Sequence, residues 1–242
     1  MKAIAGWHWI KNYVPPHIQK KRRHLVNIIE VKLTHPEREG DVSRHCTHPL
    51  CLITGDGGTM PDEVREFESW GIPHDLYCVN RSMLFFERQV DHWCAIDVEE
   101  SVWFTQNVNP KIQDSKQIVR HTIGEGSYAY DVYWEMVGDV QNEYQRRVLT
   151  GNSGYFAVLT ALEMGYEKLV LAGVPLDMNP CWYESDDEEG PNWNGWCYTQ
   201  WMDFKIKSSR AAQVKSLGGY TEFILGKATK EWVNGSSHRH SK

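Results

Sequence analysis

The chain has 242 residues, of which 41% are hydrophobic and 24% are charged, and its formal net charge is −6. These values exclude a disordered or collagen-like chain, and the acidic balance argues against general nucleic-acid binding through phosphate neutralisation. No apolar run approaches the roughly 20 residues that a membrane-spanning helix needs, so we expect no transmembrane segment.

Residues 1–48 differ from the rest of the chain because they are basic, rich in Trp and His, and interrupted by Pro15-Pro16. They contain a stretch, residues 25–33, that is compatible with either a strand or a short helix. They lack the apolar core and cleavage site of a secretory signal, and the six cysteines of the chain show no dense pairing pattern. We therefore expect an N-terminal extension at 1–48 and a cytoplasmic location.

From residue 49 onward, short apolar runs alternate with segments of helical periodicity. We expect strands at 50–54, 76–80, 93–97, 117–121, 168–173 and 220–225. We expect helices at 62–70, from 152 or 153 to 164, and at 199–217. This alternation predicts an α/β fold with a mostly parallel sheet and helices on both faces. The polar segment 177–198 interrupts it as a lid-like insertion.

Ligands of such sheets bind beyond the carboxyl ends of the strands, near the point where the strand order reverses. The turn Gly55-Asp56-Gly57-Gly58-Thr59 joins an expected strand to an expected helix and would lie at this edge. Its glycines would let the backbone approach a phosphate or diphosphate, and the helix would add unpaired N–H groups and a partial positive charge. A tight turn without a ligand explains this motif equally well.

Further polar groups lie at expected strand ends and at a helix start. The segment Asn152-Ser153-Gly154 opens a helix and could bind an anion or a ribose, or simply cap the helix. Asn80 and Arg81 follow the second strand of the domain, and Asp97 ends the third. An amide, a guanidinium and a carboxylate at these places could contact a base, a phosphate and a ribose hydroxyl. The alternative is a salt bridge between Arg81 and Asp97.

Two segments contain metal-ligating side chains. His45, Cys46, His48 and Cys51 have the residue types of a zinc site, but the spacing of the two cysteines has no matching second pair. Residues 184–189 contain five acids, which is typical of a solvated loop. The alternative for this acidic run is a divalent cation held opposite a substrate phosphate. We favour the explanations without metal and keep Mg²⁺ as the candidate cofactor.

Three motifs follow one another in a recognisable order: the turn at 55–59, Cys78-Val-Asn-Arg-Ser82, and the run from Asn152-Ser-Gly-Tyr155 to Leu169-Val-Leu-Ala-Gly-Val-Pro-Leu-Asp177. This order resembles a Rossmann-like group that includes the bacterial family 42 sialyltransferases and the archaeal MptE-like hydroxymethylpterin diphosphokinases. The resemblance covers about residues 50–177. It implies a Rossmann-like nucleotide-binding domain at 49–242, with phosphates near 55–59 and the nucleoside near Asn80 and residues 152–154. The sialyltransferases carry a catalytic histidine in the lid that follows, and residues 178–217 here contain no histidine.

The leading functional hypothesis is a transferase that uses a nucleotide-activated donor, most simply a sialyltransferase-like glycosyltransferase. Two helix N-termini and Arg81 would stabilise the departing phosphate, and a general base would take the proton of the acceptor hydroxyl. His121 is the first candidate for this base because it ends an expected strand, and Asp177 is the second.

Two alternatives to this hypothesis stay open. The first is a Mg²⁺-dependent diphosphokinase or related phosphotransferase, with the metal held by acids such as Asp97, Asp177 or Asp186. The second is a non-catalytic nucleotide-binding protein, or an assembly protein that uses residues 1–48 to dock a partner. A homo-oligomer is compatible with each of these functions.

Overall fold

The structure is a computed structural model that describes residues 32–34, 46–96, 107, 117–123, 132–137, 152–177, 181, 183 and 195–235. Its strands are β1 (Lys32–Thr34), β2 (Leu50–Thr54), β3 (Asp75–Val79), β4 (His92–Cys94), β5 (Val119–Ile123), β6 (Val132–Val137), β7 (Lys168–Ala172) and β8 (Val214–Ser216). Its helices are α2 (Met60–Glu68), α5 (Ser153–Met164), α6 (Gly195–Lys207), α7 (Gly219–Leu225) and α8 (Lys230–Asn234). Two short 3₁₀ helices are η2 (Asn80–Phe85) and η3 (Ala211–Gln213).

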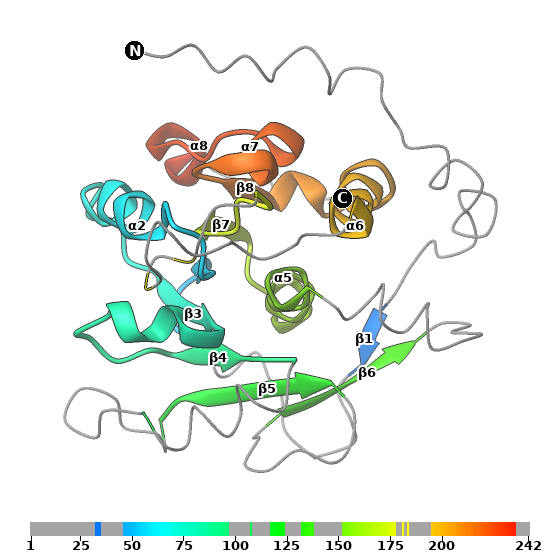
Figure 1. The fold of residues 1–242 in the computed structure, drawn as a ribbon, viewed down its shortest axis with the longest axis horizontal. Coiled ribbons are helices and arrows are strands. Elements are labelled where there is room, and N and C mark those ends of the chain that lie inside the picture. Colours follow the sequence, from blue (N-terminus) through cyan, green and yellow to red (C-terminus); the bar gives the residue numbers. More distant parts are fainter. Residues whose placement is uncertain are drawn as a thin grey trace.

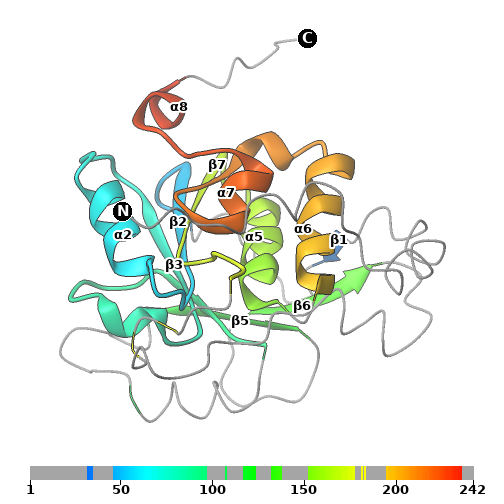
Figure 2. The ribbon, with the colours of Figure 1, turned by 45° about the horizontal axis from the view of Figure 1, so that its top comes forward.

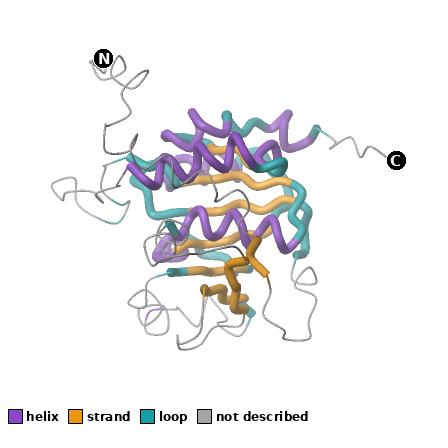
Figure 3. The backbone as a smooth tube through the Cα atoms, turned by 90° about the vertical axis from the view of Figure 1, so that its right-hand side faces the viewer, coloured by secondary structure: helices purple, strands orange, loops and turns teal. Residues whose placement is uncertain are grey.

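The strands form one eight-stranded sheet in the order β1-β6-β5-β4-β3-β2-β7-β8. β1 pairs antiparallel with β6, and all other neighbours in this order pair parallel. Figure 1 shows β1 beside β6 at one end of the sheet, and Figure 3 shows the strands stacked among the helices. The expected α/β, Rossmann-like fold with a mostly parallel sheet is therefore confirmed.

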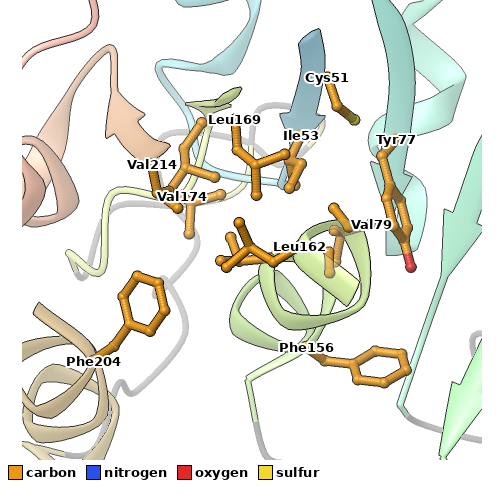
Figure 4. Packing of buried hydrophobic residues seen from close by; sticks show 14 of the residues in the cluster. Cys51, Ile53, Tyr77, Val79, Phe156, Leu162, Leu169, Val174, Phe204 and Val214 are labelled. Atoms are coloured by element: carbon orange, nitrogen blue, oxygen red, sulfur yellow. The ribbon is translucent and has the colours of Figure 1, made fainter. Parts of the chain in front are cut away.

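Two buried hydrophobic clusters cover the two faces of the sheet. One of them joins α5, α6 and α7 to the sheet, and Figure 4 shows Ile53 and Leu169 of the sheet packed near Leu162 of α5. The other joins α2 to the sheet and includes Phe67 and Leu52. Successive residues of a strand point to opposite faces, so the buried run of β2 contributes to both clusters. Helices therefore cover both faces, as expected.

The bounds of α5 follow from the residues at its two ends. Asn152 has an extended backbone, and its Oδ1 accepts the N–H of Tyr155 at 3.0 Å, which caps the helix. Gly165 has φ 99°, a left-handed conformation that favours glycine, and it ends the helix. Figures 1 and 2 both show α6 alongside α5.

The C-terminal part of the chain differs from the sequence-based expectation. The helix expected at 199–217 ends at Lys207, and the chain continues through η3 into β8. The strand expected at 220–225 is wrong, because these residues belong to α7. Thr221, Ile224 and Leu225 are the buried residues of α7, and their spacing of three and four positions places them on one helix face.

The strands beyond β3 also differ in detail from expectation. β5 covers residues 119–123, so His121 lies in the middle of the strand and not at its end. The sequence pattern predicts no element at β6, and β1 lies within the expected N-terminal extension. The rest of residues 1–45, Asp97 and most of the expected lid-like insertion lie outside the described residues.

Candidate functional site

The strand order reverses between β2 and β7. On one side of β2 lie β3, β4, β5 and β6 in succession, and on its other side lie β7 and β8. The ends of these parallel strands bring the turn at 55–59, residues 80–81 and residues 173–177 to one edge, which we call the carboxyl edge. Because doubly wound sheets bind ligands at such an edge, the strand order supports the expected location of the site.

The turns that follow β2 and β7 pack directly against each other at the carboxyl edge. The N–H of Gly55 donates to the Ala172 carbonyl at 2.8 Å, and the N–H of Gly57 donates to the Gly173 carbonyl at 2.9 Å. A Cβ on Gly55 would lie 2.4 Å from the Gly173 carbonyl oxygen, and one on Gly57 would lie 2.4 Å from Cδ of Pro175. The glycines thus permit a close approach of two turns, and both amides are bonded within the protein.

The first amides of α2 bond to backbone carbonyls of the glycine turn, and the carboxylate of Glu63 in its first turn binds the turn that follows β7. Glu63 is buried, its Oε2 accepts the N–H of Gly173 at 2.8 Å, and its Oε1 accepts the Thr59 hydroxyl at 2.6 Å. The N–H of Met60 donates to the Gly57 carbonyl, and the next residue of the helix is a proline without an N–H. These contacts favour the structural explanation of the Gly55–Thr59 motif over a phosphate-binding one.

Substitution of Glu63 by glutamine is expected to stabilise the protein at neutral pH, because burial disfavours the charged carboxylate. Burial raises the pKa of Glu63, although hydrogen bonds from Thr59 and Gly173 oppose this shift. A carboxyl whose pKa is higher in the folded state loses stability as the pH rises from its unfolded value through its folded value. The gain from Glu63→Gln should therefore grow with pH above about 4 and then level off.

Urea unfolding between pH 3 and pH 8 measures this gain, and Glu66→Gln is the matched control because Glu66 is exposed on the same helix. We expect no comparable gain for the control. A Glu63→Gln protein that is less stable than the wild type at pH 7 would contradict the expectation, since it would mean that the charge itself stabilises this contact.

The N-terminus of α5 has donors that the protein does not use. The N–H groups of Tyr155 and Phe156 bond to Asn152, but no acceptor is found for those of Ser153 and Gly154 within the described part of the chain. Because Oδ1 of Asn152 takes the Tyr155 N–H, the orientation of its amide is set. Nδ2 of Asn152 is buried without a hydrogen-bond partner, in a residue that is 2% exposed.

The polar neighbour of the Asn152 amide is the thiol of Cys197 on α6. Burial raises the pKa of this thiol to about 12, and the nearby Asn152 amide acts in the opposite direction. A protonated thiol is a weak acceptor, so it does little to satisfy a buried amide N–H. The two helix N-termini at the carboxyl edge therefore differ, because the first amides of α2 bond to backbone carbonyls, whereas those of Ser153 and Gly154 have no acceptor among the described residues.

Asn80 lies at the end of β3 and has a left-handed backbone with φ 52°. Its carbonyl accepts the indole N–H of Trp93 at 2.7 Å, while its Oδ1 is buried without a hydrogen-bond partner. The neighbouring strand brings it close to α5, because Val79 pairs with Cys94 and the Cys94 thiol points to the Ser153 carbonyl at 3.8 Å. An unsatisfied acceptor and unsatisfied donors thus gather at the same edge.

Asp56 and Arg81 also meet at the carboxyl edge. The backbone N–H of Arg81 donates to Oδ2 of Asp56 at 3.5 Å, so the turn after β2 is tied to the start of η2. The guanidinium of Arg81 lies over the ring of Tyr183, 5.6 Å from its centroid. The expected alternative, a salt bridge from Arg81 to Asp97, involves a residue outside the described part.

His121, the first candidate for a general base, lies on β5 and is fully buried, with 0% exposure. Its Nδ1 accepts the indole N–H of Trp134 at 3.1 Å, and its Nε2 lies 3.2 Å from Nδ1 of His92. His92 bonds in turn to the Tyr166 hydroxyl, which donates to Asp75 at 2.7 Å. The structure thus places His121 in a buried chain of hydrogen bonds and not at the carboxyl edge.

Asp177, the second candidate, lies at the carboxyl edge and is half-buried. It follows Leu176, a buried leucine with a left-handed backbone of φ 55°. This conformation costs a residue with a Cβ about 1–2 kcal/mol, and such strain gathers at functional sites. Pro175, which precedes Leu176, is held by a hydrogen bond in which its carbonyl accepts the N–H of Tyr220 at 2.8 Å.

Within the described ranges, no group of three His, Cys, Asp or Glu side chains could hold a metal ion. Cys51, a candidate zinc ligand, is buried in β2, and burial raises the pKa of its thiol, which opposes the thiolate that zinc needs. His45 and the acidic run at 184–189 lie outside the described residues. A search of the described helices finds none long and apolar enough to cross a bilayer.

Comparisons of the chain with family models, with curated proteins and with solved structures find no match. Function is therefore inferred from the geometry of the site itself. The sequence did not point to Glu63, Leu176 or Tyr166. No local pattern pairs Glu63 with Gly173, because the two residues lie 110 positions apart in the chain.

Proposed function

We propose that the protein is a transferase that binds a nucleotide-activated donor at the carboxyl edge, with a phosphate of the donor on the N-terminus of α5. The observation that carries this proposal is the open start of α5, where Nδ2 of Asn152 is buried without a partner beside the N–H groups of Ser153 and Gly154. Three donors at the positive end of a helix suit an anionic oxygen.

Other features at the same edge support a nucleotide over a bare anion. The unpartnered Oδ1 of Asn80 is an acceptor, and an acceptor in the site suits the hydroxyl or amino group of a nucleoside. Arg81, the next residue in the chain, adds a cation. The strained conformations of Asn80 and Leu176 lie at the carboxyl ends of β3 and of the β7 turn, where a ligand would compensate the cost of holding them.

The chemistry of group transfer assigns a role to each of these groups. An acceptor hydroxyl attacks the carbon that carries the donor phosphate, and the bond from this carbon to the phosphate oxygen breaks. The electron pair leaves on the phosphate, where the α5 amides and Arg81 stabilise it. Asp177 takes the proton of the hydroxyl, because it lies at this edge whereas His121 is enclosed in the core.

Thermal unfolding in the presence of nucleoside mono- and diphosphates and nucleotide sugars tests the proposal. A ligand at 100 times its Kd should stabilise the fold by about 2.7 kcal/mol, which raises Tm by several degrees. Release of free nucleotide from a sugar donor then measures transfer. If no compound of the panel raises Tm, the proposal is contradicted.

Ser153→Pro is expected to weaken binding of the best nucleotide of that panel about tenfold, whereas Ser153→Ala should leave it within about threefold. Proline at the first position of a helix removes one N–H but suits the backbone there, and Asn152 already has the extended conformation that a following proline requires. Both variants lose the hydroxyl, so their difference isolates the amide. Isothermal titration calorimetry measures the affinities, and urea unfolding confirms that both variants are folded.

Equal affinities of the proline and alanine variants would contradict the assignment of the phosphate to α5. This result would leave a nucleotide site elsewhere on the carboxyl edge, so the position of the phosphate and the class of ligand are tested separately.

A further inference from the structure

The side chain of Arg81 is placed by an aromatic ring from a distant part of the chain. Its guanidinium lies over the ring of Tyr183 with 5.6 Å to the ring centroid, and Tyr183 is 37% exposed. The backbone before Arg81 is fixed as well, because Asn80 has φ 52° and the Arg81 N–H bonds to Asp56. Arg81 is thus held both by its main chain and by its side chain.

Cys181, two residues before Tyr183, is anchored on the glycine turn. Cys181 forms an antiparallel bridge with Gly57, so Cys181 lies beside the turn that follows β2. Burial raises the pKa of the Tyr183 hydroxyl, and the charge of the nearby Asp56 carboxylate raises it further. Tyr183 and Asp56 both contact Arg81, at the carboxyl edge.

We propose that Tyr183 is a positioning residue that holds the Arg81 guanidinium at the carboxyl edge for the phosphate of the ligand, an inference that rests on the proposed function. The contact of the cation with the ring limits the positions that the guanidinium can take. An arginine that is already ordered loses less side-chain freedom when the anion binds. The bridge from Cys181 to Gly57 makes this part of the chain a component of the site.

The matched variants Tyr183→Phe and Tyr183→Leu test this role. The phenylalanine variant keeps the ring and removes the hydroxyl, whereas the leucine variant removes the ring. Isothermal titration calorimetry with inorganic pyrophosphate should show a Kd about fivefold higher for Tyr183→Leu and within about twofold of the wild type for Tyr183→Phe. Modification of Arg81 by phenylglyoxal, followed by peptide mass mapping without any ligand, should be faster for Tyr183→Leu and unchanged for Tyr183→Phe.

The outcomes separate this inference from the proposal on which it rests. Pyrophosphate binding with the same Kd in all three proteins, or equal modification rates at Arg81, would overturn the role of Tyr183 and leave the α5 site standing. Weaker binding in both variants alike would assign the effect to the hydroxyl and also overturn it. Wild-type protein that binds neither pyrophosphate nor any nucleotide would overturn both.

Discussion

Replacement of Gly173 by alanine is expected to destabilise the protein by about 3–5 kcal/mol. Gly173 has φ 65°, and a Cβ there would lie 2.3 Å from Cβ of Met60 and 2.7 Å from the Gly55 carbonyl oxygen. The left-handed backbone and the collision each contribute to this loss. Neither neighbour can move freely, because Met60 starts α2 and Gly55 is bonded to the end of β7. Urea unfolding measures the loss.

Gly71→Ala is the matched control for this substitution. Gly71 has φ 68°, close to that of Gly173, but nothing lies within 4 Å of a Cβ built there. Only the backbone strain applies, so we expect a loss of about 1–2 kcal/mol. Similar losses for the two variants would show that the turns after β2 and β7 separate easily, which would contradict the tight packing at the carboxyl edge.

His121→Ala is expected to destabilise the protein by about 3–5 kcal/mol, because it leaves a cavity in the core and removes the partners of two buried polar groups. The indole N–H of Trp134 loses its acceptor, and the ring of His92 loses the contact at 3.2 Å. Thermal and urea unfolding measure the loss. This result is the opposite of what a general base at the surface of a site would give, namely lost turnover in a stable protein.

His48→Ala is the control for the loss of a histidine. His48 is half-buried, and it is its backbone N–H that bonds to Asp75 at 3.2 Å, so we expect a change within about 0.5 kcal/mol. A His121→Ala protein as stable as this control would contradict the structural role, and loss of turnover in such a protein would return His121 to the mechanism.

The sequence predicts a helix or strand well where the length of the segment and the residues at its ends indicate the same element. The strand at 50–54 has the expected bounds, and α5 lies between the cap at Asn152 and the left-handed Gly165. The prediction fails where a short apolar run fits both the two-residue period of a strand and the 3.6-residue period of a helix. Residues 220–225 alternate well enough for a strand, but they bury positions 221, 224 and 225 in a helix. Tertiary packing on β8 and the β7 turn decides between the two.

The grouping of the candidate residues at one edge could be predicted better than the contacts that they make. The rule for parallel sheets brings the glycine turn, Asn80 and the start of α5 to one edge, and the structure brings them there. The rule cannot show which amides are already used, because the acceptors of Gly55 and Gly57 come from a strand more than a hundred residues later in the chain. Likewise, nothing in the residues around His121 shows that Trp134 and His92 would enclose it.

In the buried series of hydrogen bonds from Trp134 to Asp75, donation can run in one direction only. An indole nitrogen is solely a donor and a carboxylate is solely an acceptor, so the two ends dictate which nitrogen of each imidazole carries hydrogen. His121 and His92 must both exist as the Nε2–H tautomer, and neither can switch alone without setting two lone pairs or two protons against each other. One fixed arrangement of hydrogen-bond donors and acceptors thereby links the four adjacent strands β3, β4, β5 and β6.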